Sequence, residues 1–311
     1  MATPPKKPYH EVSLLDFQHS FPDEKTCWEY LKLMRWPEGI TCSRCQSKKF
    51  DFIRARRIFE CKECHKQVSV TAGTIFDKSR LPLHKWFWAI FLMATSKKGV
   101  SMLYLQKQLG IRSYETAWLM GHKIRQAMSQ REALYSLKGN VEADEIYIGG
   151  QQTFAEQRKY GTNKTPFLVM VEENNKSRPR FVSFEELESI CDKHVIPALQ
   201  KRVKKGSKLK MDGGIGYANV TKNGDYALEQ SNYRKEKEKT QENLFWVNTL
   251  TGNLKRFLLS TYHGINPKYR KAYLAEFAYR FNRRYWPHQV FDRLLYACIY
   301  SKPTPLPVLS G

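Results

Sequence analysis

The sequence lacks a hydrophobic run long enough to cross a membrane. Its longest apolar stretch, WFWAIFLMA at residues 86–94, falls far short of the ~20 residues that a membrane-spanning helix needs. The N-terminal segment MATPPKKPYHEV also has no apolar core of the kind that a secretory signal requires. We therefore expect a cytoplasmic protein without a membrane partner.

Acidic residues are scarce in this chain. Its 311 residues include 30 Asp and Glu against 52 Lys and Arg, which gives a formal net charge of +22. A surface with this charge attracts polyanions, and phosphate binding weakens as salt rises because condensed counterions are released. Since 41% of the residues are hydrophobic, the chain can also build cores. The composition predicts a globular protein that binds polyanions. Together with the motifs below, it leads us to expect a nucleoid-associated protein whose partner is double-stranded DNA.

Internal repeats and low-complexity tracts are also absent from the sequence. Changes in hydrophobic spacing and in turn signals instead divide it into successive parts. The predicted parts are an N-terminal helical segment (1–37), a segment with two cysteine pairs that we interpret as a zinc ribbon (38–76), a helical helix-turn-helix-like region (77–135), an α/β domain (136–300) and a tail (301–311).

Four of the seven cysteines occur as two close pairs, Cys42 with Cys45 and Cys61 with Cys64. The spacing C-x₂-C-x₁₅-C-x₂-C supplies four thiolates to one tetrahedral Zn²⁺ and leaves room for a hairpin between the pairs. Because four protein ligands close the coordination sphere, we expect this zinc to be structural. His65 is interpreted as a neighbouring surface residue rather than a substitute ligand. The remaining cysteines are interpreted as core residues: Cys27, Cys191 and Cys298.

The α/β domain alternates strand and helix signals. VEADEIYIGG, TPFLVMVEE and RPRFVSF predict three strands, ELESICDKHVIPALQKRV predicts a helix, and KLKMDGG predicts a fourth strand. Helices are expected from about residue 243 onward. This order is compatible with a ribonuclease-H-like core. In the preceding part, VSMLYLQKQLG and YETAWLMGHKIRQAM flank the turn GIRS, which is typical of a helix-turn-helix.

Two aspartates stand out in the predicted strands. Asp144 lies in a run of strand formers, where a desolvated carboxylate needs a charge partner or a metal. Glu142 shares its face and Glu145 faces the other way, so alternation leaves open which acid is the ligand. Asp212 ends the fourth strand just before glycines. Carboxylates on neighbouring strands could hold Mg²⁺ or Mn²⁺ on a phosphodiester.

A third metal ligand is expected on the helix that follows Asp212. Asn248 and Lys255 are seven residues apart, two helical turns, and therefore share one face. This arrangement would place an amide oxygen at the metal and an ammonium group at the DNA backbone. Glu242 and Asn253 are the alternative ligands, and an amphipathic helix with a polar stripe is the alternative interpretation.

Several longer blocks support these assignments. Together with the cysteine pairs, they make residues 17–295 resemble the zinc-ribbon-bearing insertion-sequence transposases of bacteria that are related to the eukaryotic Merlin elements. The blocks are TAGTIFDKSRLPLHKWFWAIFLM, VEADEIYIGG, MDGGIGY and WVNTLTGNLKRFLLSTYHGINPKYRKAYLAEFAYRFNRR.

The resemblance implies a DDE-type catalytic domain of ribonuclease-H-like fold. The first and second aspartates of the family fall on Asp144 and Asp212, and its third acid falls on Asn248, seven residues before Lys255. An asparagine departs from the usual glutamate and binds Mg²⁺ more weakly. The implied protein binds terminal inverted repeats, cleaves DNA and transfers strands with Mg²⁺ or Mn²⁺, and acts on DNA as a homodimer or larger assembly.

Basic residues are expected to contact the DNA backbone, since guanidinium groups bind phosphates in a bidentate manner. The predicted DNA contacts are Arg112, Lys123, Arg125, Lys255, Arg256, Arg280, Arg283 and Arg284.

Two other classes of protein fit part of the pattern: a zinc-ribbon DNA-binding regulator without catalysis, and a ribonuclease-H-like nuclease that does not join ends.

Overall fold

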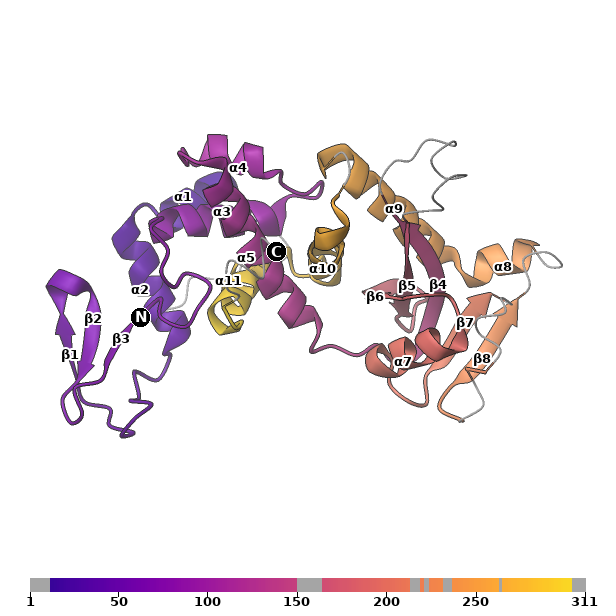
Figure 1. The fold of residues 1–311 in the computed structure, drawn as a ribbon, viewed down its shortest axis with the longest axis horizontal. Coiled ribbons are helices and arrows are strands. Elements are labelled where there is room, and N and C mark those ends of the chain that lie inside the picture. Colours follow the sequence, from indigo (N-terminus) through magenta and orange to yellow (C-terminus); the bar gives the residue numbers. More distant parts are fainter. Residues whose placement is uncertain are drawn as a thin grey trace. The chain divides into compact units, whose positions relative to one another are not determined.

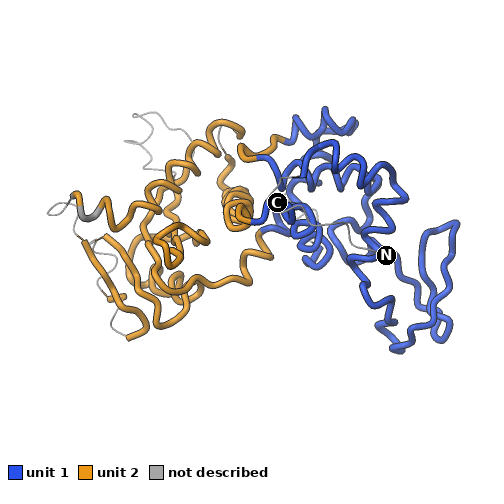
Figure 2. The backbone as a smooth tube through the Cα atoms, turned by 180° about the vertical axis from the view of Figure 1, so that it is seen from behind, with its two compact units in different colours: residues 1–96, 102–128, 286–311 blue, residues 97–101, 129–285 orange. Residues whose placement is uncertain are grey.

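The computed structural model describes residues 12–149, 164–212, 219–220, 224–231, 237–262 and 265–303. The chain forms two compact units, coloured separately in Figure 2. Unit 1 comprises residues 1–96, 102–128 and 286–311, and unit 2 comprises residues 97–101 and 129–285. Among the described residues, no helix combines the length and the apolar character needed to span a bilayer.

Unit 1 is built mainly from helices around an aromatic core. Phe17 lies 4.3 Å from Phe91 and 4.9 Å from Phe291, measured between ring centroids. Aromatic pairs at these separations contribute beyond their buried area. The helices are α1 (Leu14–Ser20), α2 (Glu24–Arg35), α3 (Leu83–Thr95), α4 (Met102–Gln108), the first part of α5 (Tyr114–Glu132), and α11 (Val290–Tyr300), which follows the short turn η4 (Pro287–Gln289).

Helix α11 differs from the sequence prediction, which assigned residues up to 300 to the α/β domain. Its Phe291 packs against Phe17, Phe21 and Phe87 of unit 1. In addition, Asp292 accepts a hydrogen bond of 2.7 Å from Tyr30 of α2. The last helix therefore completes the core of unit 1.

The ribbon of unit 1 is a small antiparallel sheet. Trp28 of α2 stacks on the ribbon residue Phe59 and contacts Phe52, so the ribbon rests on the preceding helix. Arg57 adopts the left-handed conformation that closes the hairpin, with φ of 50°. The elements are β1 (Phe50–Ile53), η1 (Arg54–Arg56), β2 (Ile58–Cys61) and β3 (Gln67–Ser69).

Helices α4 and α5 are joined by a turn at residues 109–113, as the helix-turn-helix pattern predicts. The two helices approach closely where Gly121 of α5 faces Met102 of α4. A Cβ atom built on Gly121 would lie 2.0 Å from the Met102 sulfur. Only glycine fits this crossing without a shift of Met102.

Unit 2 contains a mixed five-stranded sheet with the order β6-β5-β4-β7-β8, visible in Figure 1. The pairs β4–β5 and β5–β6 are antiparallel, whereas the pairs β4–β7 and β7–β8 are parallel. The predicted order of three strands, a helix and a fourth strand is confirmed, and β8 is an addition that the sequence did not reveal. The strands are β4 (Asn140–Ile148), β5 (Thr165–Glu173), β6 (Pro179–Glu186), β7 (Lys208–Asp212) and β8 (Ala227–Ser231).

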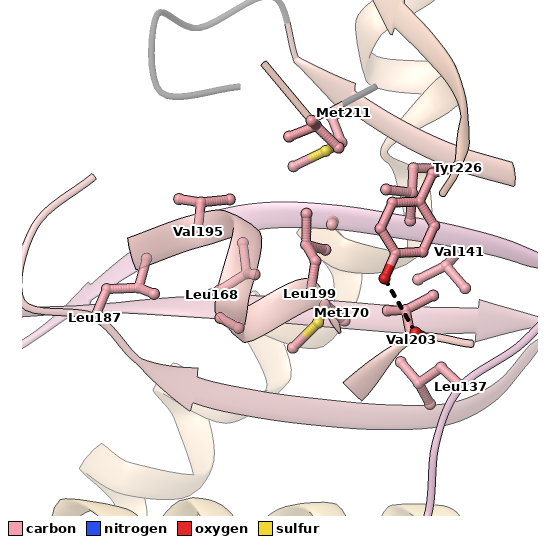
Figure 3. Close-up of a cluster of buried hydrophobic side chains, with 14 residues drawn as sticks. Leu137, Val141, Leu168, Met170, Leu187, Val195, Leu199, Val203, Met211 and Tyr226 are labelled. Carbon is pink, nitrogen blue, oxygen red and sulfur yellow. Dashed lines mark hydrogen bonds between the residues drawn. The ribbon is translucent and has the colours of Figure 1, made fainter. Parts of the chain in front are cut away.

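Helices cover both faces of this sheet. On one face, α7 packs Val195 and Leu199 onto the strands, and Tyr226 donates a hydrogen bond of 3.1 Å to the carbonyl of Val203 (Figure 3). On the other face, α9 and α10 pack Val247, Leu254 and Phe277 against the sheet. The helices of unit 2 are α7 (Asp192–Arg202), α8 (Lys237–Asn243), α9 (Phe245–Tyr262) and α10 (Arg270–Asn282), with a short turn η3 (Pro267–Tyr269) before α10.

Candidate metal centres and active site

The four paired cysteines form one cluster in unit 1. Their sulfur atoms all lie within 4.8 Å of one another. The sulfurs of Cys42 and Cys64 are 3.5 Å apart, as are those of Cys45 and Cys61. Tetrahedral zinc with ~2.3 Å bonds to sulfur implies separations of about 3.8 Å. The cluster therefore fits a zinc ion with four thiolate ligands, as the spacing predicts.

Each cysteine pair is held by the same backbone pattern. The residue after the second cysteine of each pair has a left-handed backbone conformation: φ is 61° at Gln46 and 57° at His65. The amide of Gln46 donates to the carbonyl of Cys42, and the amide of His65 donates to the carbonyl of Cys61, both at 2.9 Å. The amides of Cys45 and Arg44 lower the pKa of the Cys42 thiol to about 6, which favours the thiolate that binds metal.

His65 lies outside the cysteine cluster, in agreement with its interpretation as a surface neighbour. Its side chain is 77% exposed, and its Nδ1 lies 3.5 Å from Glu60. The cluster found in the described part of the chain contains cysteines alone.

Asp144 and Asp212 lie on neighbouring parallel strands and point to the same face of the sheet. Asn140 pairs with Lys208 and Glu142 pairs with Lys210, so Asp144 and Asp212 each stand two residues further along in register. Alternate residues of β4 and β7 belong to the core beneath α7. Both aspartates consequently face α9, the side that would carry the third ligand.

The charge of Asp212 affects the pKa of Asp144. Burial, followed by the charge of Glu145 and with a further contribution from Asp212, raises the pKa of Asp144 from 3.8 to about 7. A neighbouring anion disfavours ionisation, whereas a divalent cation favours it. Two half-buried carboxylates at one level of a sheet are ligands of the kind that Mg²⁺ and Mn²⁺ prefer. The donor set therefore fits a divalent metal.

A buried glutamate shares the face of the sheet that carries Asp144 and Asp212. Glu142 is 1% exposed and accepts a hydrogen bond of 2.8 Å from the backbone amide of Val247 in the first turn of α9. Burial and a hydrogen bond to Glu173 raise the pKa of Glu142 to about 8. Lys210 in turn donates to both oxygens of Glu173, at 2.9 and 3.2 Å. Sequence alternation placed Glu142 beside Asp144 but gave no sign of these contacts.

Helix α9 carries Asn248 one residue after its hydrogen bond to β4. Asn248 follows Val247, whose amide reaches Glu142, and its side chain is exposed. Of the alternative ligands, Glu242 belongs to α8, before the break at residue 244, and Asn253 accepts a hydrogen bond of 3.1 Å from Arg256. Asn248 is thus the alternative that adjoins the contact between α9 and β4.

Ser231 is a neighbour of Asp212 that the sequence did not reveal. It pairs with Asp212 in the parallel register of β8, is 1% exposed, and its hydroxyl has no hydrogen-bond partner among the described residues. No strand was predicted at ALEQS, because its polar composition gives a weak strand signal. Without β8, the sequence offered no reason to place a serine beside the second aspartate.

The structure corrects the expectation that the arginines of α10 and α5 all lie on a DNA-facing surface. Arg283 is 5% exposed and is paired with Glu132. The side chain of Arg280 is 10% exposed and donates to the carbonyl of Lys97. Arg125 is 0% exposed. These guanidinium groups are held inside their own units and have little surface to offer a phosphate.

The other predicted DNA contacts are placed differently. Arg284 is half-buried and donates to the carbonyl groups of Pro179 and Arg180. Lys123 is half-buried and donates to the carbonyl of Ile75 at 3.3 Å. Three predicted contacts lie exposed, in the turn between α4 and α5 and along α9: Arg112, Lys255 and Arg256.

A four-cysteine ribbon followed by a mixed sheet with two aspartates on adjacent strands is the arrangement expected of a zinc-ribbon-bearing insertion-sequence transposase. Comparison with family models agrees: residues 22–67 match the transposase zinc-ribbon domain, and residues 136–282 match the ISXO2-like transposase domain of the IS1595 group. The chain therefore carries a transposase zinc-ribbon domain and a transposase domain of this group.

A curated relative is also known. The chain is similar to an uncharacterized protein in the transposable element ISH50 of Halobacterium salinarum, with 26% identity over 132 residues. The matched region covers 42% of this chain and 43% of that protein. The chain therefore matches less than half the length of its relative.

Proposed function

We propose that the protein is a transposase that binds the terminal inverted repeats of its insertion sequence, cleaves DNA and joins the new ends to target DNA. One observation carries this proposal: Asp144 and Asp212 stand at one level and on one face of adjacent parallel strands. They lie within the stretch that matches a transposase domain. Pairs of carboxylates suit metal-assisted phosphoryl transfer.

The residues have separate roles in this proposal. Asp144, Asp212 and Asn248 would hold Mg²⁺ or Mn²⁺, which would activate the attacking oxygen and stabilise the leaving oxygen. Lys255 would bind a DNA phosphate on the same face of α9, since residues seven apart lie on one side of a helix. Arg112 and Arg256 are exposed and would add backbone contacts. The zinc would hold the ribbon in shape and perform no chemistry.

The proposal includes the assembly that acts on DNA. Two transposon ends must be processed together, so the active form would be a homodimer or a larger assembly on DNA. Sedimentation of the protein with and without end DNA would measure this directly. A monomer bound to paired, joined ends would contradict it.

A strand-transfer assay tests the function. The full chain is mixed with end-labelled DNA from the borders of its element, a target plasmid and Mg²⁺ or Mn²⁺. We expect metal-dependent nicking and joined products, both lost in Asp144→Asn and Asp212→Asn with DNA binding retained. Asp225→Asn is the matched control, because Asp225 pairs with Lys205 just before β8.

The same assay separates the competing functions. Binding to the ends without cleavage would identify a DNA-binding regulator. Cleavage without joined products or preference for inverted repeats would identify a nuclease. Cleavage that survives both aspartate substitutions would exclude the proposed metal site.

A further inference from the structure

Helix α9 does not continue directly from α8, because the helix is interrupted at residue 244. Helix α9 lies on the face of the sheet that carries Asp144 and Asp212. In an uninterrupted helix the amide of Val247 would donate to the carbonyl of Asn243. Here it donates to the side chain of Glu142, while the next amide, that of Asn248, pairs with the carbonyl of Leu244. A carboxyl group of β4 therefore takes the place of one backbone carbonyl of the helix, one residue before Asn248.

The acceptor itself is fixed in place. Glu142 is fully enclosed, with 1% exposure, and shares a hydrogen bond with Glu173. Glu173 is held by Lys210, whose ammonium group lies 2.9 Å from one of its oxygens. Lys210 stands on β7 two residues before Asp212, just as Glu142 stands two residues before Asp144. The strands that carry both aspartates are thus linked to each other and to the first turn of α9.

We propose that Glu142 is a positioning residue that sets Asn248 relative to Asp144 and Asp212 through its hydrogen bond to the amide of Val247. Lys210 and Glu173 hold Glu142 in the orientation that this bond requires. The inference rests on the proposed metal site and goes beyond it, because Glu142 acts through α9 and does not bind the metal. Groups that orient metal ligands typically affect metal affinity by ~10–100-fold.

Two substitutions distinguish the length of the Glu142 side chain from its negative charge. Glu142→Gln keeps an oxygen at the same distance along the side chain, so it can still accept from Val247. Glu142→Asp keeps the acid but is shorter by one methylene group and falls short of the amide. A positioning role predicts that Gln is tolerated and Asp is not. A role as a metal ligand or as a necessary negative charge predicts the opposite order.

The experiment measures Mn²⁺ affinity of the full chain by calorimetry, with folding checked by circular dichroism and thermal unfolding. We expect Glu142→Asp to weaken Mn²⁺ binding by about 10-fold or more and Glu142→Gln to stay close to wild type. Glu172 provides the matched control. It is a 3% exposed glutamate of the same sheet that accepts from the amide of Lys138 at 2.9 Å, on the face covered by α7. Its Gln and Asp variants should leave Mn²⁺ affinity unchanged.

Each outcome decides the question. Wild-type affinity in a folded Glu142→Asp, or a greater loss in Glu142→Gln, would overturn the inference. If Glu142→Asp does not fold, Glu142→Met, which fills the space without an acceptor, takes its place. Failure of both to fold while the Glu172 variants fold would also overturn it, since Glu142 would then be a folding residue. Wild-type Mn²⁺ affinity in Asp144→Ala would instead show that the proposed metal site is wrong.

Discussion

Asp144 and Asp212 stand at the same level of two parallel strands, and the charge of Asp212 contributes to the raised pKa of Asp144. In the metal-free protein, burial of Asp144, then the charges of Glu145 and Asp212, disfavour the ionised form of Asp144. The folded state therefore loses stability as the pH rises from about 3.8 to about 7, and above pH 7 this loss is complete. Asp144→Asn removes it, so at pH 8 we expect the free energy of unfolding to rise by about 1 kcal/mol, a value reduced by the solvent that reaches this half-buried site.

Urea unfolding measures that change, and Mn²⁺ should reverse it. A cation that binds only the folded state stabilises the wild type and leaves Asp144→Asn nearly unaffected. A substituted protein that is less stable than the metal-free wild type would contradict the proposed cost of keeping a charged Asp144 in this buried site.

Removal of zinc should unfold the ribbon. The purified protein is expected to contain one zinc per chain, and Cys61→Ser should lose it because three thiolates and a hydroxyl hold zinc poorly. Metal analysis and limited proteolysis of residues 42–67 measure the result. Cys191→Ser is the control, since Cys191 lies outside the cysteine cluster. Equal zinc content in both variants would exclude the site.

Unit 1 should lose stability in acid because of His122. This residue is 2% exposed, and burial together with the charge of Arg125 lowers its pKa from 6.5 to about 3. The unfolded chain binds the proton below about pH 6.5 and the folded chain only below about pH 3. The contribution of neutral His122 to the free energy of unfolding is therefore fully present above pH 6.5. It falls by about 1.4 kcal/mol per pH unit as the pH drops toward 3.

Chemical unfolding of His122→Gln between pH 4 and pH 7 checks this expectation. The substitution should remove that part of the pH dependence, whereas the exposed His19 should tolerate the same change without effect on the slope. An unchanged slope in His122→Gln would assign acid sensitivity to other groups.

Lys255 should contribute to DNA binding without affecting the fold. Its side chain is exposed on α9, so Lys255→Ala should weaken binding to all sequences and reduce the salt dependence by about one phosphate contact. Titrations of labelled DNA at several salt concentrations measure this slope. The matched control is Lys205→Ala, an exposed lysine paired with Asp225. Equal slopes for the two variants would remove Lys255 from the DNA contacts.

Local patterns predicted much of this protein from its sequence. The spacing of Cys42, Cys45, Cys61 and Cys64 requires only two tight turns and a hairpin, and such features are encoded by neighbouring residues. The strand-forming residues of β4 and the apolar run of β5 likewise identified the central strands. Asp212 was identifiable because glycines follow it at the end of a strand.

Long-range relationships could not be predicted in the same way. From the sequence, Arg283 resembles a surface residue of a basic helix. In the structure it is buried inside unit 2 and paired with Glu132, 151 positions earlier. Glu142 gains its partner from Val247, 105 positions later. A single sequence contains no signal for which distant residue neutralises a buried charge, so exposure of individual arginines was the least predictable property.

The return of the chain to unit 1 affects how the protein matures during synthesis. Translation produces Phe17, Phe21 and Phe87 early, but their partner Phe291 emerges only after nearly the whole polypeptide has been made. Domains usually fold in order as they leave the ribosome. Here the N-terminal helices complete their core only when α11 has been made, so a prematurely terminated product would expose an aromatic surface and be prone to degradation.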